Sequence, residues 1–130
     1  MTKQIVEVPG MSEWIRKGKV PLSPVVKANG FVFVSGLPPM DLATGGFVKG
    51  DIAAQTERCL EHIKTALDSA GSSLDKVVKV TVFITNAAYF TTVNEIYARY
   101  FGKDAPARTF VNVGSWPGAF DIEIECVAVA

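Results

Sequence analysis

The sequence ends in two strand-like segments, Pro106-Ala107-Arg108-Thr109-Phe110-Val111-Asn112-Val113 and Asp121-Ile122-Glu123-Ile124-Glu125-Cys126-Val127-Ala128-Val129. β-Branched and aromatic residues recur in both at nearly alternate positions, which predicts two β-strands. Residues 114–118 between them contain the Pro and Gly that end strands and form connections. Because side chains alternate between faces, Arg108, Phe110 and Asn112 share one row of the first strand. In the second strand, the row of Ile122, Ile124, Cys126 and Ala128 opposes the row that carries Glu123 and Glu125.

Arg108 and two carboxylates, Glu123 and Glu125, are thus placed on rigid strands rather than on loops. A charge on a strand is costly unless it has a partner or a function. One interpretation is a structural ion pair between Arg108 and one of the carboxylates, or exposure of these groups to water. The other is a binding site.

Length and composition bound the function. A chain of 130 residues suffices for one core and is too short for two, so we expect a single domain over residues 1–130. Apolar residues make up 48% and charged residues 20%, which is typical of a globular protein. Thirteen basic residues balance thirteen acidic ones, and this argues against a nucleic-acid partner.

The sequence also indicates a compartment. Its N-terminus has no apolar targeting segment and no stretch is long enough to span a bilayer, so we expect a soluble, cytoplasmic protein with no membrane association. Cys59 and Cys126 are too few for a disulfide framework, and both lie on apolar rows, which favours burial. With one histidine and no Cys-x-x-Cys motif, we predict no metal site.

The N-terminal half is predicted to hold strands, loops and one long helix. We expect a strand at residues 3–8, a surface loop at 11–24, a hairpin of 25–27 with 31–35 turned at Asn29-Gly30, and at most a short strand near Phe47-Val48. Asp51 suits the N-cap of a helix that ends at Gly71. Its apolar stripe comprises Ile52, Thr56, Cys59, Leu60, Ile63, Leu67 and Ala70, and we expect His62, beside the polar face, to be a solvated surface residue.

Residues 77–84 predict a further strand with Val78, Val80, Val82 and Ile84 in one row, and residues 88–101 a second helix. The order of these elements favours an α+β domain with both helices on one face of a mixed sheet. The other face would then expose Phe31, Phe33, Phe83, Val127 and Val129. Because such an apolar area usually marks an interface, we expect a homo-oligomer with Arg108 and Glu123 in or beside a cleft between subunits.

The segments at Pro106-Ala107-Arg108-Thr109 and residues 122–129 resemble the Rid family of reactive intermediate deaminases, also called YjgF or L-PSP endoribonuclease-like proteins. The resemblance covers nearly the whole chain from about Pro21 and continues through residues 33–36, 50–56, 70–74, 78–83 and 93–97. It implies a chorismate-mutase-like fold, a homotrimer and active sites in clefts between subunits. It also implies hydrolysis of reactive enamines and imines to keto acids and ammonia without a cofactor.

The resemblance further implies roles for individual residues. Arg108 matches the arginine that holds the substrate carboxylate, and Glu123 matches the glutamate associated with the attacking water. Ser35 and Asn94 match pocket-lining positions, and the backbone after Arg108, at Thr109 and Phe110, contributes to substrate binding. From the residues alone, Glu125 is in the same row as Glu123 and suits the same chemistry.

Three positions depart from the best-known deaminases of the family. Leu22 stands where a tyrosine is common, Leu37 where a glutamine often follows Ser-Gly, and Phe110 where a small residue or cysteine is frequent. All three changes add apolar bulk near the expected substrate. They indicate either a larger or less polar imine, such as an aminomuconate-type ring-cleavage product, or simple packing. Residues 11–19, with Trp14, have no family counterpart and are expected either to cover the cleft or to form a surface loop.

Two other functional classes compete with the deaminase. The first is a non-catalytic trimer that uses Arg108 to bind a small carboxylate as a sensor or chaperone-like protein. The second is the ribonuclease of the older family label, against which the zero net charge and the lack of a basic groove argue.

Overall fold

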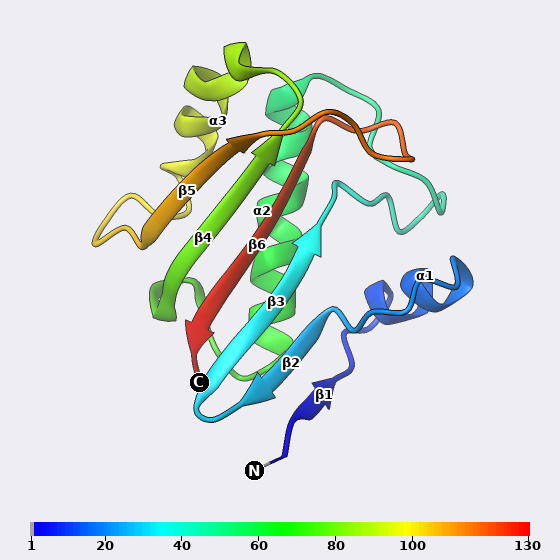
Figure 1. Cartoon of the computed structure of the whole chain (residues 1–130), viewed down its shortest axis with the longest axis vertical. Helices are drawn as coiled ribbons and strands as arrows, with labels where there is room; N and C mark the ends of the chain where they lie inside the picture. The colour runs from blue at the N-terminus through cyan, green and yellow to red at the C-terminus, as the bar shows by residue number, and fades with distance from the viewer. Residues whose placement is uncertain (1) are drawn as a thin grey trace.

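A six-stranded mixed sheet forms the centre of the computed structural model, which describes residues 2–130 (Figure 1). The strands lie in the order β1-β2-β3-β6-β4-β5. Their bounds are Gln4–Val6 for β1, Val25–Ala28 for β2, Phe31–Leu37 for β3, Val77–Ile84 for β4, Ala107–Asn112 for β5 and Ile122–Val129 for β6. Neighbouring strands are antiparallel except β4 and β5, which are parallel. The predicted hairpin is confirmed, because Asn29 and Gly30, with φ of 52° and 80°, form the turn between β2 and β3.

The two C-terminal strands are not neighbours, because β4 lies between them. A parallel pair such as β4 and β5 needs a crossover connection. The connection here contains the 3₁₀-helix η2 (Ala87–Tyr89) and the helix α3 (Phe90–Tyr97). The predicted rows of β6 are confirmed, since Ile122, Ile124, Cys126 and Ala128 are buried in the core.

The helices α2 (Ile52–Ser69) and α3 pack together behind the same face of the sheet, as predicted (Figure 1). The Asp51 carboxylate accepts a hydrogen bond from the Ala54 N–H at 3.0 Å and caps α2. Gly71, with φ of +75°, follows its C-terminus in the left-handed conformation, and a 3₁₀-helix, η1 (Leu74–Lys76), leads into β4. The α3 helix is shorter than the predicted 88–101, because its first turn is 3₁₀ and residues 98–100 form turns.

The prediction of a solvated His62 is wrong. Its side chain is only 6% exposed, and its Nε2 lies 2.8 Å from the Met40 carbonyl oxygen. The carbonyl can only accept, so Nε2 carries the proton and donates. Burial lowers the pKa of His62, although the hydrogen bond to Met40 opposes this effect. The segment after β3, which carries Met40, therefore covers His62, although the sequence pattern of α2 places this residue beside the polar face.

The prediction of a loop at residues 11–24 is also wrong in its first half, where Met11–Lys17 form the helix α1. Met11 and Ile15 are buried in the core. Together with Trp14 they follow the i, i+3, i+4 spacing of an apolar helix face. The Gly10 N–H donates to the Glu13 carboxylate at 3.2 Å, which supports the first turn. Residues 2–130 thus contain three α-helices rather than the two that the sequence predicts.

The predicted row of β4 is wrong at its first residue. A register shift between Val77 and Lys79 leaves Val78 as an extra residue opposite β6. Val77 faces the core at 7% exposure, and Val78 is 44% exposed. Two other strand predictions change in length: β1 is shorter than residues 3–8, and the region of Phe47 contributes a single bridge to Met40.

The sheet face opposite α2 and α3 carries an apolar row, as predicted. Ile5, Val26, Phe33 and Val127 lie side by side across four strands. Phe33 is 44% exposed in the single chain, and Phe31 and Val129 are exposed beside it. In the described part of the chain, no helix is long and apolar enough to cross a membrane.

Candidate functional site

Arg108 lies on the helix side of the sheet, at its edge strand β5. It is in register with Val80, which is fully buried beneath the helices. The guanidinium carbon lies 4.7 Å from the ring centre of Tyr97 and 5.4 Å from that of Phe110. Phe90 is a third ring, at 5.8 Å. Aromatic faces attract a cation and hold its plane while leaving its N–H donors available.

The guanidinium of Arg108 has no carboxylate partner within residues 2–130, where the ion pair found joins Arg16 to Glu7. The interpretation of a structural ion pair between Arg108 and Glu123 or Glu125 is therefore wrong for the single chain. A half-buried guanidinium that is held by rings and lacks an anion suits a carboxylate ligand.

Two buried polar atoms on α3, the helix that carries the Tyr97 ring beside Arg108, lack partners among residues 2–130. Asn94 Oδ1 and the Tyr97 hydroxyl, one helical turn apart on α3, are buried and form no hydrogen bond with residues 2–130. Burial raises the pKa of Tyr97 to about 12, against the opposing effect of the Arg108 charge, so the hydroxyl keeps its proton. Buried polar groups are rarely left unpaired. The group of Arg108, Asn94 and Tyr97 therefore offers both donors and an acceptor to a polar ligand or a second protein surface.

Glu123 lies on the other face of the sheet, in register with Phe83 on β4. Its side chain is half-buried, and burial raises the pKa of the carboxyl, with a further contribution from the Glu125 charge. Gly36 permits this position, because a Cβ at residue 36 would collide with Glu123 Oε1. A carboxylate with a raised pKa is a better proton acceptor than an exposed one.

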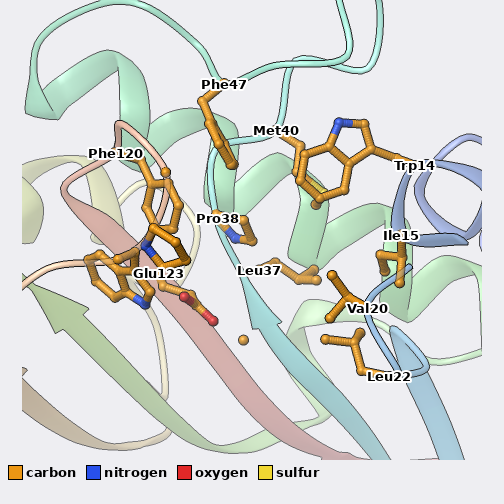
Figure 2. A pocket seen from close by; sticks show the side chains of 14 residues that line it. Trp14, Ile15, Val20, Leu22, Leu37, Pro38, Met40, Phe47, Phe120 and Glu123 are labelled. Atoms are coloured by element: carbon orange, nitrogen blue, oxygen red, sulfur yellow. The ribbon is translucent and has the colours of Figure 1, made fainter. Parts of the chain in front are cut away.

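Glu123 borders a pocket of about 280 Å³ (Figure 2). The two apolar substitutions at Leu22 and Leu37 line it, and α1 contributes Trp14 and Ile15. Residues 11–19 thus form a wall of the pocket rather than an unrelated surface loop. The remaining lining residues are Val20, Gly36, Pro38, Met40, Phe47, Trp116, Pro117, Gly118 and Phe120.

The other candidate residues are distributed over both faces. Phe110 packs edge-on against Phe90 at 4.9 Å, beside Arg108. Ser35 Oγ donates to the Ser23 carbonyl at 2.6 Å and so holds the segment that carries Leu22. Thr109 Oγ1 accepts from Lys79 Nζ at 2.7 Å on the face opposite Arg108.

The candidate residues therefore form two groups. Arg108 and Phe110 lie on the edge strand β5 on the helix side of the sheet, with Asn94 on the helix α3, and Glu123 and Leu22 line the pocket. No lining residue of the pocket belongs to the Arg108 group. A single chain does not bring Arg108 and Glu123 together.

The segment of Trp14, which the sequence predicts either to cover the cleft or to form a surface loop, contributes to an aromatic row along the pocket; the prediction missed the other members of this row, Phe47, Phe120 and Trp116. Trp14 and Phe47 pack edge-on with ring centres 5.6 Å apart, and Phe47 and Phe120 are 4.7 Å apart. Phe120 and Trp116 stack, also at 4.7 Å. These residues come from three separate segments, and the only local signal was the aromatic content of two connections. Residues 2–130 hold no cluster of three or more His, Cys, Asp or Glu side chains suited to a metal ion.

Known proteins resemble this chain over most of its length. Residues 16–130 match the family model described as Endoribonuclease L-PSP. The RutC family protein PH0854 of Pyrococcus horikoshii is 47% identical over 108 residues, which are 83% of this chain and 86% of that protein. Reactive Intermediate Deaminase A, chloroplastic, of Arabidopsis thaliana is 42% identical over 108 residues, 83% of this chain and 58% of that protein. The structure of YyfA from Yersinia pestis, of the conserved Rid protein family, has a TM-score of 0.89 and 37% identity and covers 99% of this chain and 100% of that chain.

Proposed function

Because the chain belongs to the Rid family, whose model carries the description Endoribonuclease L-PSP, we propose that it hydrolyses reactive enamines and imines to keto acids and ammonia. A relative that bears the name Reactive Intermediate Deaminase A supports this choice of reaction. The proposal is carried by the environment of Arg108, a half-buried guanidinium that three rings hold and that has no carboxylate partner within residues 2–130.

The complete site forms between copies of the chain. Arg108 and Glu123 lie on opposite faces of one sheet, so a substrate that contacts both needs two protomers. The exposed apolar row with Phe33 and Val127 is a surface that a second copy would bury. These observations support the homotrimer of chorismate-mutase-like subunits, with a cleft between neighbours, that the family resemblance implies.

Arg108 binds the substrate carboxylate. Its planar fork can donate two parallel hydrogen bonds to the two carboxylate oxygens, and this fixes the neighbouring imine carbon in position. Asn94, with its unpaired buried Oδ1, accepts a hydrogen bond from the substrate nitrogen or from an ordered water. The backbone of Thr109 and Phe110 continues the same edge strand and lies beside the bound carboxylate.

Glu123 activates the water. The carboxylate takes a proton from a water molecule whose oxygen forms a bond to the imine carbon, while the C=N π electrons move to the nitrogen. The nitrogen takes this first proton back from Glu123. It then receives the proton of the new hydroxyl group through the same carboxylate, the C–N bond breaks with its electron pair leaving on ammonia, and the C=O bond of the keto acid forms. The sum is one imine and one water converted to one keto acid and one ammonia. An enamine enters the same sequence after protonation at carbon, and no step requires a cofactor.

Ser35 and Leu22 act on the position of the substrate. Ser35 anchors the Ser23 carbonyl, and Leu22 replaces a polar contact with apolar bulk in the pocket. A larger pocket fits a bulkier imine, and its apolar lining favours an imine with an apolar side chain over an aminomuconate-type product. The protein acts on these small molecules in the cytoplasm, without a nucleic-acid or membrane partner.

The test generates imines in situ with an amino-acid oxidase or a dehydratase and follows ammonia or keto-acid release. We expect the wild type to accelerate release and Arg108→Ala and Glu123→Ala to abolish the acceleration. Tyr100→Phe, which removes a surface hydrogen bond to Glu61, serves as a matched control. Absence of acceleration with every imine would contradict the proposal. Carboxylate binding that is lost in Arg108→Ala but kept in Glu123→Ala would then favour a non-catalytic binding protein.

A further inference from the structure

The pocket beside Glu123 has the size and chemistry of a subsite for one apolar ring. We propose that the aromatic row selects imines and enamines whose side chain is an uncharged aromatic group, in preference to small or dicarboxylic ones. The inference rests on the proposed deaminase function and names its substrate class. It is carried by the position of Trp14, Phe47, Phe120 and Trp116 along a cavity that ends at the proposed catalytic carboxylate.

The volume fits such a side chain. An apolar cavity of ~150 Å³ is enough to hold benzene. The pocket, at about 280 Å³, accommodates a ring with its linking methylene. A substrate with a one-carbon side chain would leave the aromatic surfaces in contact with water and would gain nothing from them.

The charge distribution excludes a dicarboxylate. Among the described residues that line the pocket, Glu123 alone has an ionisable side chain. A second carboxylate placed in the pocket would lose its hydration next to a negative charge, with no cation to compensate. This argues against an aminomuconate-type product, which carries a carboxylate at each end.

The pocket leads to the reacting groups. Figure 2 shows the Glu123 carboxylate at one side of the pocket and Trp14 at the other, with Phe47 and Phe120 between them along one wall. Glu123 also borders a second cavity of about 210 Å³ on the open sheet face, together with Phe83 and Glu125. A ring in the apolar pocket therefore places the imine carbon at Glu123 and directs the carboxylate toward the open face, where a second protomer would supply Arg108.

The walls are preorganised. The Trp14 indole N–H donates to the Gly45 carbonyl at 3.1 Å, and α1 is anchored by the buried Met11 and Ile15. Gly118 allows the close approach of Phe47, because a Cβ there would lie 2.5 Å from Phe47 Cε2. A rigid pocket binds its ligand without a large ordering cost.

The experiment compares imines generated from phenylalanine, alanine and glutamate with purified wild-type protein. We expect kcat/KM to be roughly 10–200-fold higher for the phenylalanine imine than for either of the others. Trp14→Ala and, as variants that keep the core intact, Phe47→Leu and Phe120→Leu should reduce this ratio at least several-fold. Tyr100→Leu, which removes a ring outside the pocket, should keep the ratio.

A binding measurement gives an independent readout. Phenylpyruvate should quench tryptophan fluorescence saturably in the wild type and more weakly in Phe120→Leu, and pyruvate should require a much higher concentration. Equal or faster turnover of the alanine or glutamate imine, or a ratio that survives all three pocket substitutions, would overturn the inference and leave the deaminase intact. If no imine is hydrolysed faster and phenylpyruvate binds no more tightly than pyruvate, both the proposed deaminase function and the aromatic preference would be overturned.

Discussion

Arg108 and Glu123 lie on opposite faces of one sheet, with β4 between their strands. The guanidinium belongs to the row of Val80 beneath the helices, and the carboxylate to the row of Phe83 on the open face. Three aromatic rings surround the Arg108 guanidinium, and burial raises the pKa of the Glu123 carboxyl. Catalysis by both requires that two protomers each contribute one of them.

Arg108→Lys should not replace arginine. A lysine retains the charge but not the planar fork, so one of two parallel hydrogen bonds to the carboxylate is lost. Loss of a hydrogen bond to a charged group predicts a fall in kcat/KM of roughly 10- to 100-fold, mainly through KM. Steady-state kinetics with oxidase-generated imine measure this effect. A lysine variant with wild-type KM would show that the arginine does not grip the carboxylate.

Glu123→Gln should lower kcat by ~10²–10⁴-fold, because the amide cannot accept the proton of water. In the wild type, activity should rise with pH through a pKa above the ordinary carboxyl value of 4.5, because burial and Glu125 raise the pKa of Glu123. The pH dependence of kcat/KM measures this limb. An acid limb at or below the ordinary value would contradict a buried general base.

The same substitution should stabilise the fold near neutral pH. Since the folded chain keeps the Glu123 proton to a higher pH than the unfolded chain, stability is lost as pH rises from 4.5 through the raised pKa. Glu123→Gln removes this loss, so its Tm should exceed that of the wild type at pH 7 and approach it at pH 4. Thermal unfolding at the two pH values provides the comparison. An equal difference in Tm at both pH values would mean that ionisation of the Glu123 carboxyl does not cause the change in stability.

Gly36→Ala should reduce turnover without unfolding the protein. The added Cβ would displace the Glu123 carboxylate, which is the flexible end of a side chain and can move. We expect kcat to fall while thermal stability changes little, since no core residue is replaced. Gly46→Ala is a suitable control, because a Cβ there meets only the Thr44 hydroxyl at 3.8 Å. Unchanged turnover in Gly36→Ala would show that the carboxylate position is not critical.

His62→Gln should reduce the loss of stability in acid. Burial lowers the pKa of His62 below 6.5, with Arg58 adding to the effect and the Met40 hydrogen bond and Glu61 opposing it. Stability is therefore complete above pH 6.5 and is lost as pH falls, because the unfolded chain takes up the proton first. Glutamine keeps a donor for the Met40 carbonyl and does not titrate. The unfolding curves recorded at pH 7 and at pH 5 should lie closer together for the variant than for the wild type.

The sequence predicts well what depends on local patterns. The alternation in β6, the Asp51 cap and the Asn29-Gly30 turn are all properties of neighbouring residues, and each has its expected structure. α1 also had a local signal in the spacing of Met11, Trp14 and Ile15. The Gly and Pro residues around this short segment outweighed that signal and favoured a loop.

The remaining features depend on contacts between distant segments. The burial of His62 arises from the segment of Met40 that crosses α2, and the aromatic row joins Trp14 to residues more than a hundred positions later. Arg108 and Glu123 are separated because β4 lies between their strands and because the register puts Arg108 in the row of Val80 and Glu123 in the row of Phe83, on opposite faces. Neither side-chain alternation nor strand propensity specifies strand order or register. The sequence therefore assigns the two charged residues to strands but does not decide whether one chain brings them to the same site.

A mixture of two inactive variants tests most directly whether the site is an imine-hydrolysing centre shared between protomers. Arg108→Ala and Glu123→Ala are co-expressed and the mixed oligomers are assayed for ammonia release from imine. In a closed ring assembled at random, about a quarter of the sites receive an intact Arg108 and an intact Glu123 from neighbouring chains, so activity should return to about a quarter of the wild-type value. Mixed oligomers that form but stay as inactive as either variant alone would contradict the account.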